Sequence, residues 1–147
     1  MTTTSTTNSE DGGTDTPQLF NSPELERPIG FSHAATARGE TYWFSGQISV
    51  DENGGILYQG DMAMQFGQAL RNLAAELRAA KCEPINVIKL TYFVTDITAY
   101  KNAAHAIGPH YVEVFGHHFP PATLVEVKGL IDPEAMVEIE CVAVRHG

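Results

Sequence analysis

The stretch VIKLTYFVT, residues 87–95, is dense in β-branched and aromatic residues, a composition that favours a β-strand. Directly after it, Thr98 can cap a helix. The apolar positions of this helix recur at helical spacing, at Tyr100, Ala104, Ile107, Tyr111 and Phe115. The pair Gly108-Pro109 is expected to kink or split it. The middle of the chain therefore predicts a strand followed by an amphipathic helix.

Toward the N-terminus, two short β-prone runs at 33–37 and 41–50 flank the turn Arg38-Gly39-Glu40, which predicts a hairpin. The run Asp-Glu-Asn-Gly-Gly at 51–55 then breaks the chain. Asp61 suits an N-cap for a helix that should run to about Lys81. Its apolar positions are Phe66, Leu70, Leu73 and Leu77.

Toward the C-terminus, strands are predicted at 123–128 and 136–145, separated by the turn signal Asp132-Pro133. The order of elements is then β-β-α-β-α-β-β, which predicts an α+β two-layer domain with a mixed sheet and both helices on one face. The other sheet face is expected to carry Val, Ile, Leu and Tyr. Because no segment remains to cover that face, we expect the chain to associate with itself.

The chain of 147 residues, 43% hydrophobic, has the size and apolar content of one domain. Residues 1–27 are rich in Thr, Ser, Asp, Gly and Pro and are predicted to be a flexible tail, so the domain is expected at 28–147. Leu19 and Phe20 offer an alternative, a short arm that docks on the domain or on a neighbouring subunit.

The net charge of −9, from 18 acidic and 9 basic residues, argues against binding to nucleic acid or to an anionic membrane. The sequence contains no apolar run long enough to suggest a membrane span, and its cysteines number only two, Cys82 and Cys141. We therefore expect a cytoplasmic, thiol-reduced protein in which both cysteines are packing residues.

Two acidic residues, Glu138 and Glu140, share one face of the last predicted strand, because strand side chains alternate. Paired acids can perform acid–base chemistry. On a strand they more commonly pair with lysines across the sheet, here Lys89 or Lys128, and this structural interpretation is favoured by spacing alone.

A second group of reactive side chains is His110, Glu113, His117 and His118. On one helix these residues would lie near one another and could bind a metal. Their spacing matches no zinc signature, and histidines also suit a helix C-terminus, so solvated helix-end residues are the favoured interpretation.

Five motifs occur along the chain: G-F-S-H-A at 30–34, F-S-G-Q-I at 44–48, V-I-K-L-T-Y-F-V-T-D at 87–96, F-P-P-A at 119–122 and V-E-I-E at 137–140. In this order they resemble the motifs of the Rid (reactive intermediate deaminase, or YjgF) family. The resemblance covers about residues 28 to 145. It implies a chorismate-mutase-like α+β fold and a homotrimer with three clefts between subunits.

The enzymes of this family hydrolyse small 2-enamines or 2-imines to 2-oxo acids and ammonia, without metal or cofactor. Carried over to this chain, the resemblance makes Glu138 the residue that activates water. The residues that match the family's substrate contacts are Phe31, Ser45, Gly46, Thr123 and Leu124.

One departure from the family lies directly after the prolines, where deaminating members typically carry an arginine that binds the substrate carboxylate. Ala122 occupies that position here. The resemblance therefore implies a hydrolase for imines, enamines or related metabolites other than the standard amino-acid-derived imine. The alternatives are a trimer that binds a small metabolite without turning it over, and a structural or partner-binding role.

Overall fold

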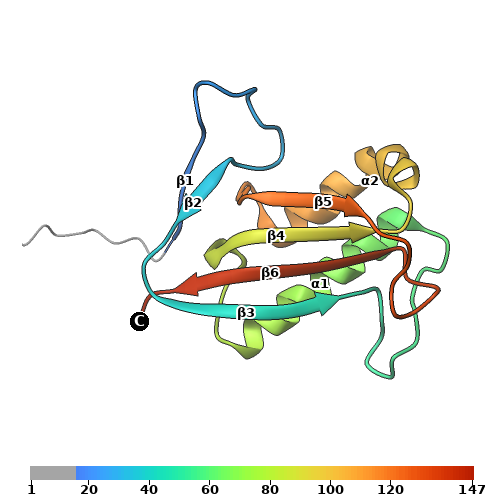
Figure 1. Ribbon diagram of the computed structural model, residues 1–147. Coiled ribbons are helices and arrows are strands. Elements are labelled where there is room, and N and C mark those ends of the chain that lie inside the picture. Colours follow the sequence, from blue (N-terminus) through green and yellow to red (C-terminus); the bar gives the residue numbers. More distant parts are fainter. Residues whose placement is uncertain (1–15) are drawn as a thin grey trace, which may run out of the picture.

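The computed structural model describes residues 16–147 (Figure 1). The predicted tail at 1–27 therefore lies partly outside the described residues. The elements in chain order are β1 (Gln18–Phe20), β2 (Ala34–Thr36), β3 (Glu40–Gln47), α1 (Met62–Ala79), the short 3-10 helix η1 (Pro84–Asn86), β4 (Val87–Val94), α2 (Ile97–Phe115), β5 (Ala122–Glu126) and β6 (Val137–Arg145). From β2 onward this order is the predicted one.

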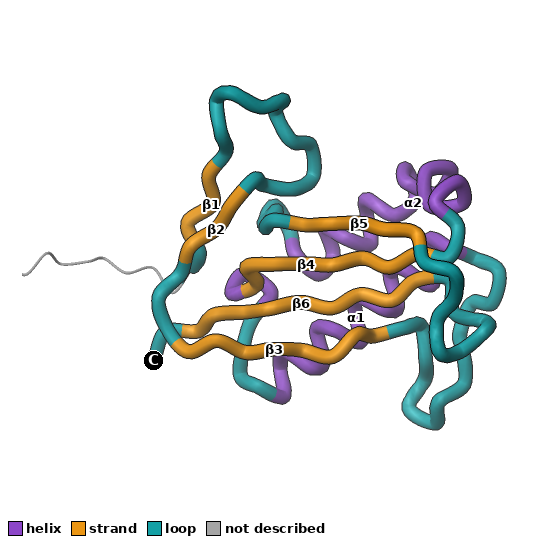
Figure 2. Tube along the Cα trace, in the orientation of Figure 1, coloured by secondary structure: helices purple, strands orange, loops and turns teal. Residues whose placement is uncertain are grey.

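The main sheet has the strand order β3-β6-β4-β5. β6 runs antiparallel to both β3 and β4, whereas β5 runs parallel to β4, so the sheet is mixed. Figures 1 and 2 show α1 and α2 side by side across one face of this sheet. The predicted α+β two-layer architecture, with both helices on one face, is confirmed.

The core lies between the helices and this sheet. α1 begins at the predicted cap, where the Asp61 carboxylate accepts a hydrogen bond of 3.0 Å from the Met64 amide. Its inward stripe of Leu70, Leu73 and Leu77 is fully buried, which gives the helix most of its stability. No helix in the described chain has the length and apolar content needed to cross a membrane.

The predicted hairpin between residues 33–37 and 41–50 is wrong. β2 pairs with β1 in a separate two-stranded sheet, and β3 pairs with β6 (Figure 2). Gly39 does not form the predicted turn between them. Gly39 lies where the chain passes from the two-stranded sheet to the main sheet. Its φ of 140° and its closeness to the Arg145 backbone leave no room for a side chain, so glycine is required there. Within the predicted tail, Gln18–Phe20 form β1, so the described fold begins before residue 28.

The helix α2 begins two residues earlier than predicted, because Asp96 rather than Thr98 is its N-cap. The Asp96 carboxylate accepts a 3.0 Å hydrogen bond from the Ala99 amide. The helix also continues through Pro109 as one element to Phe115. Close to Pro109, α2 packs tightly against α1, and this packing supports the helix. A methyl group on Gly67 of α1 would lie only 2.7 Å from Cγ of His110 on α2.

The open sheet face, meaning the face opposite the helices, differs in composition from the prediction. Leu90, Tyr92 and Val94 of β4 are buried against the helices, because alternate side chains of a strand point to opposite faces. The open face instead combines hydrophobic side chains with Thr, Lys and Glu. Its most exposed aromatic residue is Trp43, whose exposed fraction is 79%.

Candidate functional site

The acidic residue Glu138 lies on the open face, beside an irregularity in β3. Phe44 pairs with Cys141 and Gln47 pairs with Ile139, so Ser45 and Gly46 together oppose the single residue between those partners. This arrangement is a β-bulge, a feature that often occurs beside active sites. The carboxylate of Glu138 lies against Gly46, since a methyl group on that glycine would meet Oε2, Cδ and Cγ of the glutamate.

The favoured pairing of the two glutamates with lysines is wrong. Lys89 donates a 2.8 Å hydrogen bond from Nζ to Oγ1 of Thr123, and Lys128 is exposed. Among the described residues neither Glu138 nor Glu140 forms an ion pair. Glu138 is thus a half-buried carboxylate that is free to accept a hydrogen bond or a proton.

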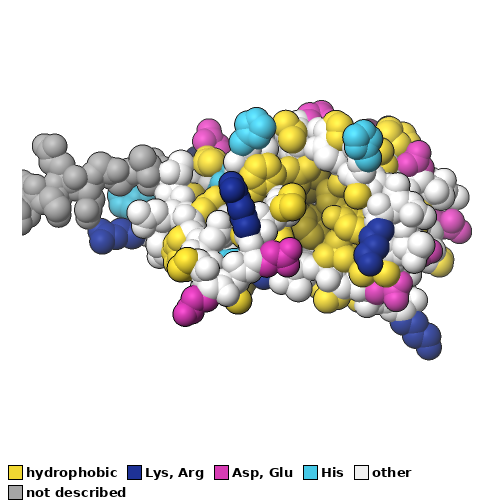
Figure 3. Space-filling view, turned by 90° about the horizontal axis from the view of Figure 1, so that it is seen from above, with side chains coloured by type: hydrophobic (Ala, Val, Ile, Leu, Met, Phe, Trp, Pro, Cys, Tyr) yellow, Lys and Arg dark blue, Asp and Glu magenta, His cyan; other side chains and the backbone are white. Residues whose placement is uncertain are grey.

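On the opposite face of the sheet, a cavity of about 510 Å³ opens between α2, β5 and the segment at 29–31. We call it the helix-side cavity. Its thirteen lining residues are Ile29, Gly30, Phe31, Tyr92, Tyr100, Ala104, Ile107, Gly108, Tyr111, Val112, Phe119, Ala122 and Leu124. Figure 3 shows hydrophobic side chains across this hollow, with charged side chains around it. None of the lining residues is charged.

The sheet separates the candidate residues into two groups. Phe31, Ala122 and Leu124 line the helix-side cavity. Ser45, Gly46, Thr123 and Glu138 lie on the open face. The division within β5 follows from strand alternation, which points Thr123 away from its two neighbours. One copy of the chain therefore does not bring all the predicted residues together.

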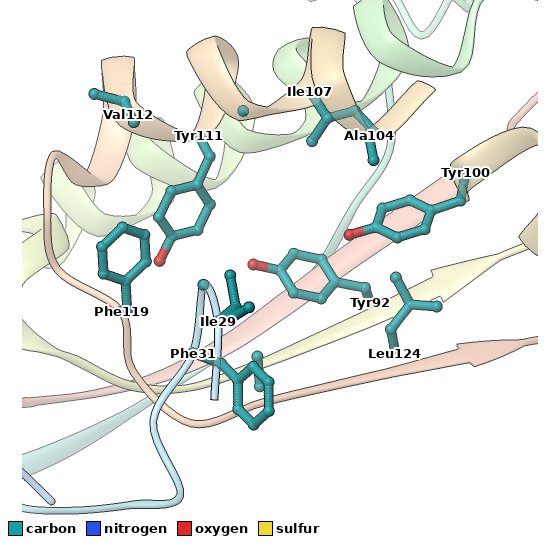
Figure 4. Close-up of a pocket in the computed structure, with 13 residues that line it drawn as sticks. Ile29, Phe31, Tyr92, Tyr100, Ala104, Ile107, Tyr111, Val112, Phe119 and Leu124 are labelled. Carbon is teal, nitrogen blue, oxygen red and sulfur yellow. The ribbon is translucent and has the colours of Figure 1, made fainter. Parts of the chain in front are cut away.

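Three tyrosines of the helix-side cavity were not predicted as site residues, because their positions read as ordinary core positions. Figure 4 shows Tyr92, Tyr100 and Tyr111 directing their rings and hydroxyl groups toward the cavity. The Tyr111 hydroxyl donates a 2.6 Å hydrogen bond to the carbonyl of His118. Burial raises the pKa of all three phenols, so they remain protonated donors near neutral pH. The sequence did offer one signal for these residues, which is a tyrosine at a position expected to be buried. A buried tyrosine hydroxyl needs a hydrogen-bond partner, so it can mark a binding site.

The histidine group does not assemble a metal site. His118 is buried and its Nε2 donates a 2.8 Å hydrogen bond to the carbonyl of Val87, while Glu113 forms an ion pair of 3.5 Å with Arg71. His117 is exposed. Within residues 16–147, no cluster of three or more His, Cys, Asp or Glu side chains is arranged to hold a metal ion.

Both cysteines are buried and free, as predicted for packing residues. Burial raises the pKa of the Cys82 thiol and raises that of Cys141 to about 12. Neither thiol is therefore ionised at neutral pH, and neither has the character of a nucleophile.

Comparisons with known proteins identify the family of the chain. The family model described as endoribonuclease L-PSP matches residues 24–145. A human protein named 2-iminobutanoate/2-iminopropanoate deaminase is 33% identical over 117 residues, which cover 80% of this chain and 82% of that protein. A RutC family protein, UK114, from Drosophila melanogaster is 32% identical and covers 86% of this chain and 88% of its own length.

Solved structures share the fold. The Rid family protein YyfB from Yersinia pestis superimposes with a TM-score of 0.79 at 28% identity, over 88% of this chain and 98% of that one. The YjgF protein from E. coli gives a TM-score of 0.61 at 29% identity, over 88% of this chain and 99% of its own.

Proposed function

The chain belongs to the endoribonuclease L-PSP family, also called the Rid or YjgF family, and on this premise we propose that it hydrolyses imines or enamines. The observation that carries the proposal is the carboxylate of Glu138, held against the Ser45-Gly46 bulge without an ion-pair partner among the described residues. A carboxylate in that position can accept a proton from water as the water oxygen attacks an imine carbon. The products are an oxo compound and ammonia.

We propose that the complete site forms between copies of the chain in a homotrimer. The helix-side cavity of one copy supplies Phe31, Ala122 and Leu124, and the open face of the next supplies Ser45, Gly46, Thr123 and Glu138. Two observations support this assembly. The two groups lie on opposite faces of one sheet, and the open face carries the exposed ring of Trp43. Burial of that ring between subunits would be favourable.

The substrate is proposed to differ from the standard 2-imino acids. Ala122 lines the cavity in place of the family arginine, and the cavity lining contains no cation. Loss of a charge-assisted bond to a carboxylate costs about 1.5–3 kcal/mol, or roughly one to two powers of ten in binding. Lys89 is engaged with Thr123 on the other face of the sheet and does not replace the arginine in the cavity.

A second candidate function is binding of a small metabolite without turnover. The observation that favours it is the uncharged lining of the helix-side cavity. The cavity has the size of a ligand-binding site, but its lining lacks the arginine that binds the substrate carboxylate in deaminating family members. In this alternative Glu138 has no catalytic task.

Ammonia release from a panel of freshly generated imines distinguishes the two candidates. We expect the wild type to accelerate hydrolysis of at least one panel member over the buffer rate, and Glu138→Gln to abolish the acceleration. Glu140→Gln is the matched control, because it changes a glutamate on the same face of the same strand and should retain activity. No ammonia above the buffer rate from any imine would favour the binding function.

A further inference from the structure

The size and the aromatic, uncharged lining of the helix-side cavity suit an uncharged ring. Its volume of about 510 Å³ lies within the usual range for small-molecule sites. Aromatic rings form much of its wall, and Figure 4 shows those of Phe31, Tyr92, Tyr111 and Phe119 around the space. Tyr111 and Phe119 are stacked with their ring centroids 5.4 Å apart and their planes 6° from parallel. A carboxylate entering this space would lose its hydration without gaining a cation, which is strongly unfavourable.

One polar group inside the cavity is available to a ligand. Tyr92 is only 7% exposed, and its ring is held by stacking on Phe66 at a centroid distance of 5.3 Å. Its hydroxyl points into the cavity and has no hydrogen-bond partner among the described residues (Figure 4). The Tyr111 hydroxyl, by contrast, is already bound to the carbonyl of His118. Because this hydroxyl opens into the cavity and has no protein partner, it can donate a hydrogen bond to a ligand that brings an acceptor.

We propose that this cavity binds neutral aryl ketones and the corresponding imines, with the ring between the aromatic walls and the ketone oxygen or imine nitrogen accepting a hydrogen bond from Tyr92. The binding requires only the cavity. That such imines are substrates rests on the proposed function. In that reaction water adds its oxygen to the imine carbon and gives both protons to the nitrogen, which leaves with the electrons of the C–N bond as ammonia.

Binding of three probes to the full-length protein tests the proposal by calorimetric titration at pH 8. The probes are acetophenone, ethylbenzene and benzoate. All three contain a benzene ring. Acetophenone also offers a neutral hydrogen-bond acceptor, ethylbenzene offers no acceptor, and benzoate carries a negative charge. We expect acetophenone to bind about three- to tenfold more tightly than ethylbenzene, the range of one hydrogen bond, and benzoate not to bind detectably. Equal affinity for acetophenone and ethylbenzene, or tighter binding of benzoate, would overturn the proposal.

Variants locate the binding within the cavity. Tyr92→Phe removes only the hydroxyl and should reduce acetophenone affinity three- to tenfold, while leaving ethylbenzene affinity unchanged. Tyr58→Phe is the matched control, because Tyr58 lies outside the cavity lining, and it should change neither affinity. An unchanged preference for acetophenone in Tyr92→Phe would show that this hydroxyl is not the donor.

Gly108→Leu provides a second test that does not depend on the fold tolerating a change at Tyr92. Gly108 lines the cavity, and apart from its chain neighbours and the backbone of its own helix, a Cβ at this position would meet no atom within 4 Å. Because Pro109 follows directly, circular dichroism must show that the variant is folded before its affinity is compared. The larger side chain should occupy the cavity and lower acetophenone affinity by more than tenfold. Unchanged affinity in a folded Gly108→Leu protein would place the probe elsewhere and overturn the proposal.

Turnover of freshly prepared acetophenone imine separates this inference from the proposed function. If acetophenone binds as expected but no imine of any kind is hydrolysed above the buffer rate, the cavity assignment stands and the hydrolase function fails. If other imines are hydrolysed but acetophenone does not bind, the hydrolase function stands and the cavity assignment fails.

Discussion

The side chain of Glu138 on β6 lies against Gly46 on β3, so closely that a methyl group on the glycine would be 2.8 Å from both Cγ and Cδ of the glutamate. Carbon atoms that are not bonded to one another do not approach to that distance without displacement of one of them. In the β-bulge between Phe44 and Gln47, Ser45 and Gly46 oppose Glu140, and Gly46 lies diagonally across from Glu138 on the same strand. The absence of a side chain at Gly46 therefore leaves the space that the Glu138 carboxylate occupies.

The first prediction follows from this contact. Gly46→Ala should displace the Glu138 carboxylate and lower kcat for imine hydrolysis at least tenfold, since a displacement of about 1 Å can cost roughly 10²-fold in rate. Ammonia release measures the rate, and circular dichroism verifies the fold. Gly129→Ala is the control, because a Cβ there meets no atom within 4 Å. Full activity in Gly46→Ala would show that Glu138 does not need this position.

The second prediction concerns the pH dependence of stability. His118 is buried, and burial lowers its pKa below the ordinary value of 6.5. Above pH 6.5 the ring is neutral in the folded and unfolded chain, and its hydrogen bond to Val87 is intact. As the pH falls below that value, the unfolded chain takes up the proton first. The stability contributed by neutral His118 is therefore lost as the pH falls through the lowered pKa of the folded state.

Urea denaturation at a series of pH values measures this effect. His118→Gln, whose amide can still donate to the Val87 carbonyl, should flatten the pH dependence of the free energy of unfolding just below pH 6.5. His117→Gln is the neighbouring control, because His117 is exposed, and it should follow the wild type. Identical slopes for His118→Gln and the wild type would contradict the assignment.

Much of the fold could be predicted because its signals are local. The strand at Val87–Val94 and the capping of α1 by Asp61 follow from residues that are neighbours in sequence. The partner of β2 could not be predicted in this way. Turn residues at 38–40 suit a hairpin, but strand pairing depends on the distant segment Gln18–Phe20. The cap of α2 was misassigned by two residues, because Asp96 and Thr98 are both good capping residues.

The candidate site could be predicted only in part. The family motifs identified its residues, but they carry no information on which face of the sheet each side chain occupies. Strand alternation separates Ala122 and Leu124 from Thr123, but which of the two sets faces the helices depends on how β5 pairs with β4. The bulge at Ser45-Gly46 depends on the register with β6, which lies about ninety residues further along the chain.

The third prediction concerns assembly. Trp43 is 79% exposed on the open face, so Trp43→Asp should place a charge in the proposed interface and convert a trimer to monomers. Light scattering at micromolar concentration measures the mass. Ile131→Asp is the control, because Ile131 is 95% exposed in the loop before β6, and it should remain a trimer. A wild-type mass equal to that of one chain would contradict both the trimer and a site shared between subunits.

The fourth prediction restores the missing charge. Ala122 lines the helix-side cavity at the start of β5, so Ala122→Arg should direct a guanidinium toward that space. An arginine there can form a bidentate pair with the carboxylate of a 2-oxo acid or a 2-imino acid. We expect pyruvate binding to tighten by roughly ten- to a hundredfold, the range of a charge-assisted bond. Deamination of 2-iminopropionate should appear or increase.

Two matched variants make this prediction specific. Thr123→Arg introduces the same charge one residue further on, but on the open face beside Lys89, and should not tighten pyruvate binding in the cavity. Glu138→Gln combined with Ala122→Arg should keep the tighter pyruvate binding and lose the gain in deamination, because the carboxylate clamp remains while the base is removed.

Folding must be verified first, since an arginine without a bound anion is unfavourable in an apolar cavity. A folded Ala122→Arg protein with neither tighter pyruvate binding nor activity on 2-iminopropionate would show that the substrate carboxylate does not enter this cavity. Recognition by the wild type would then depend on the open face instead.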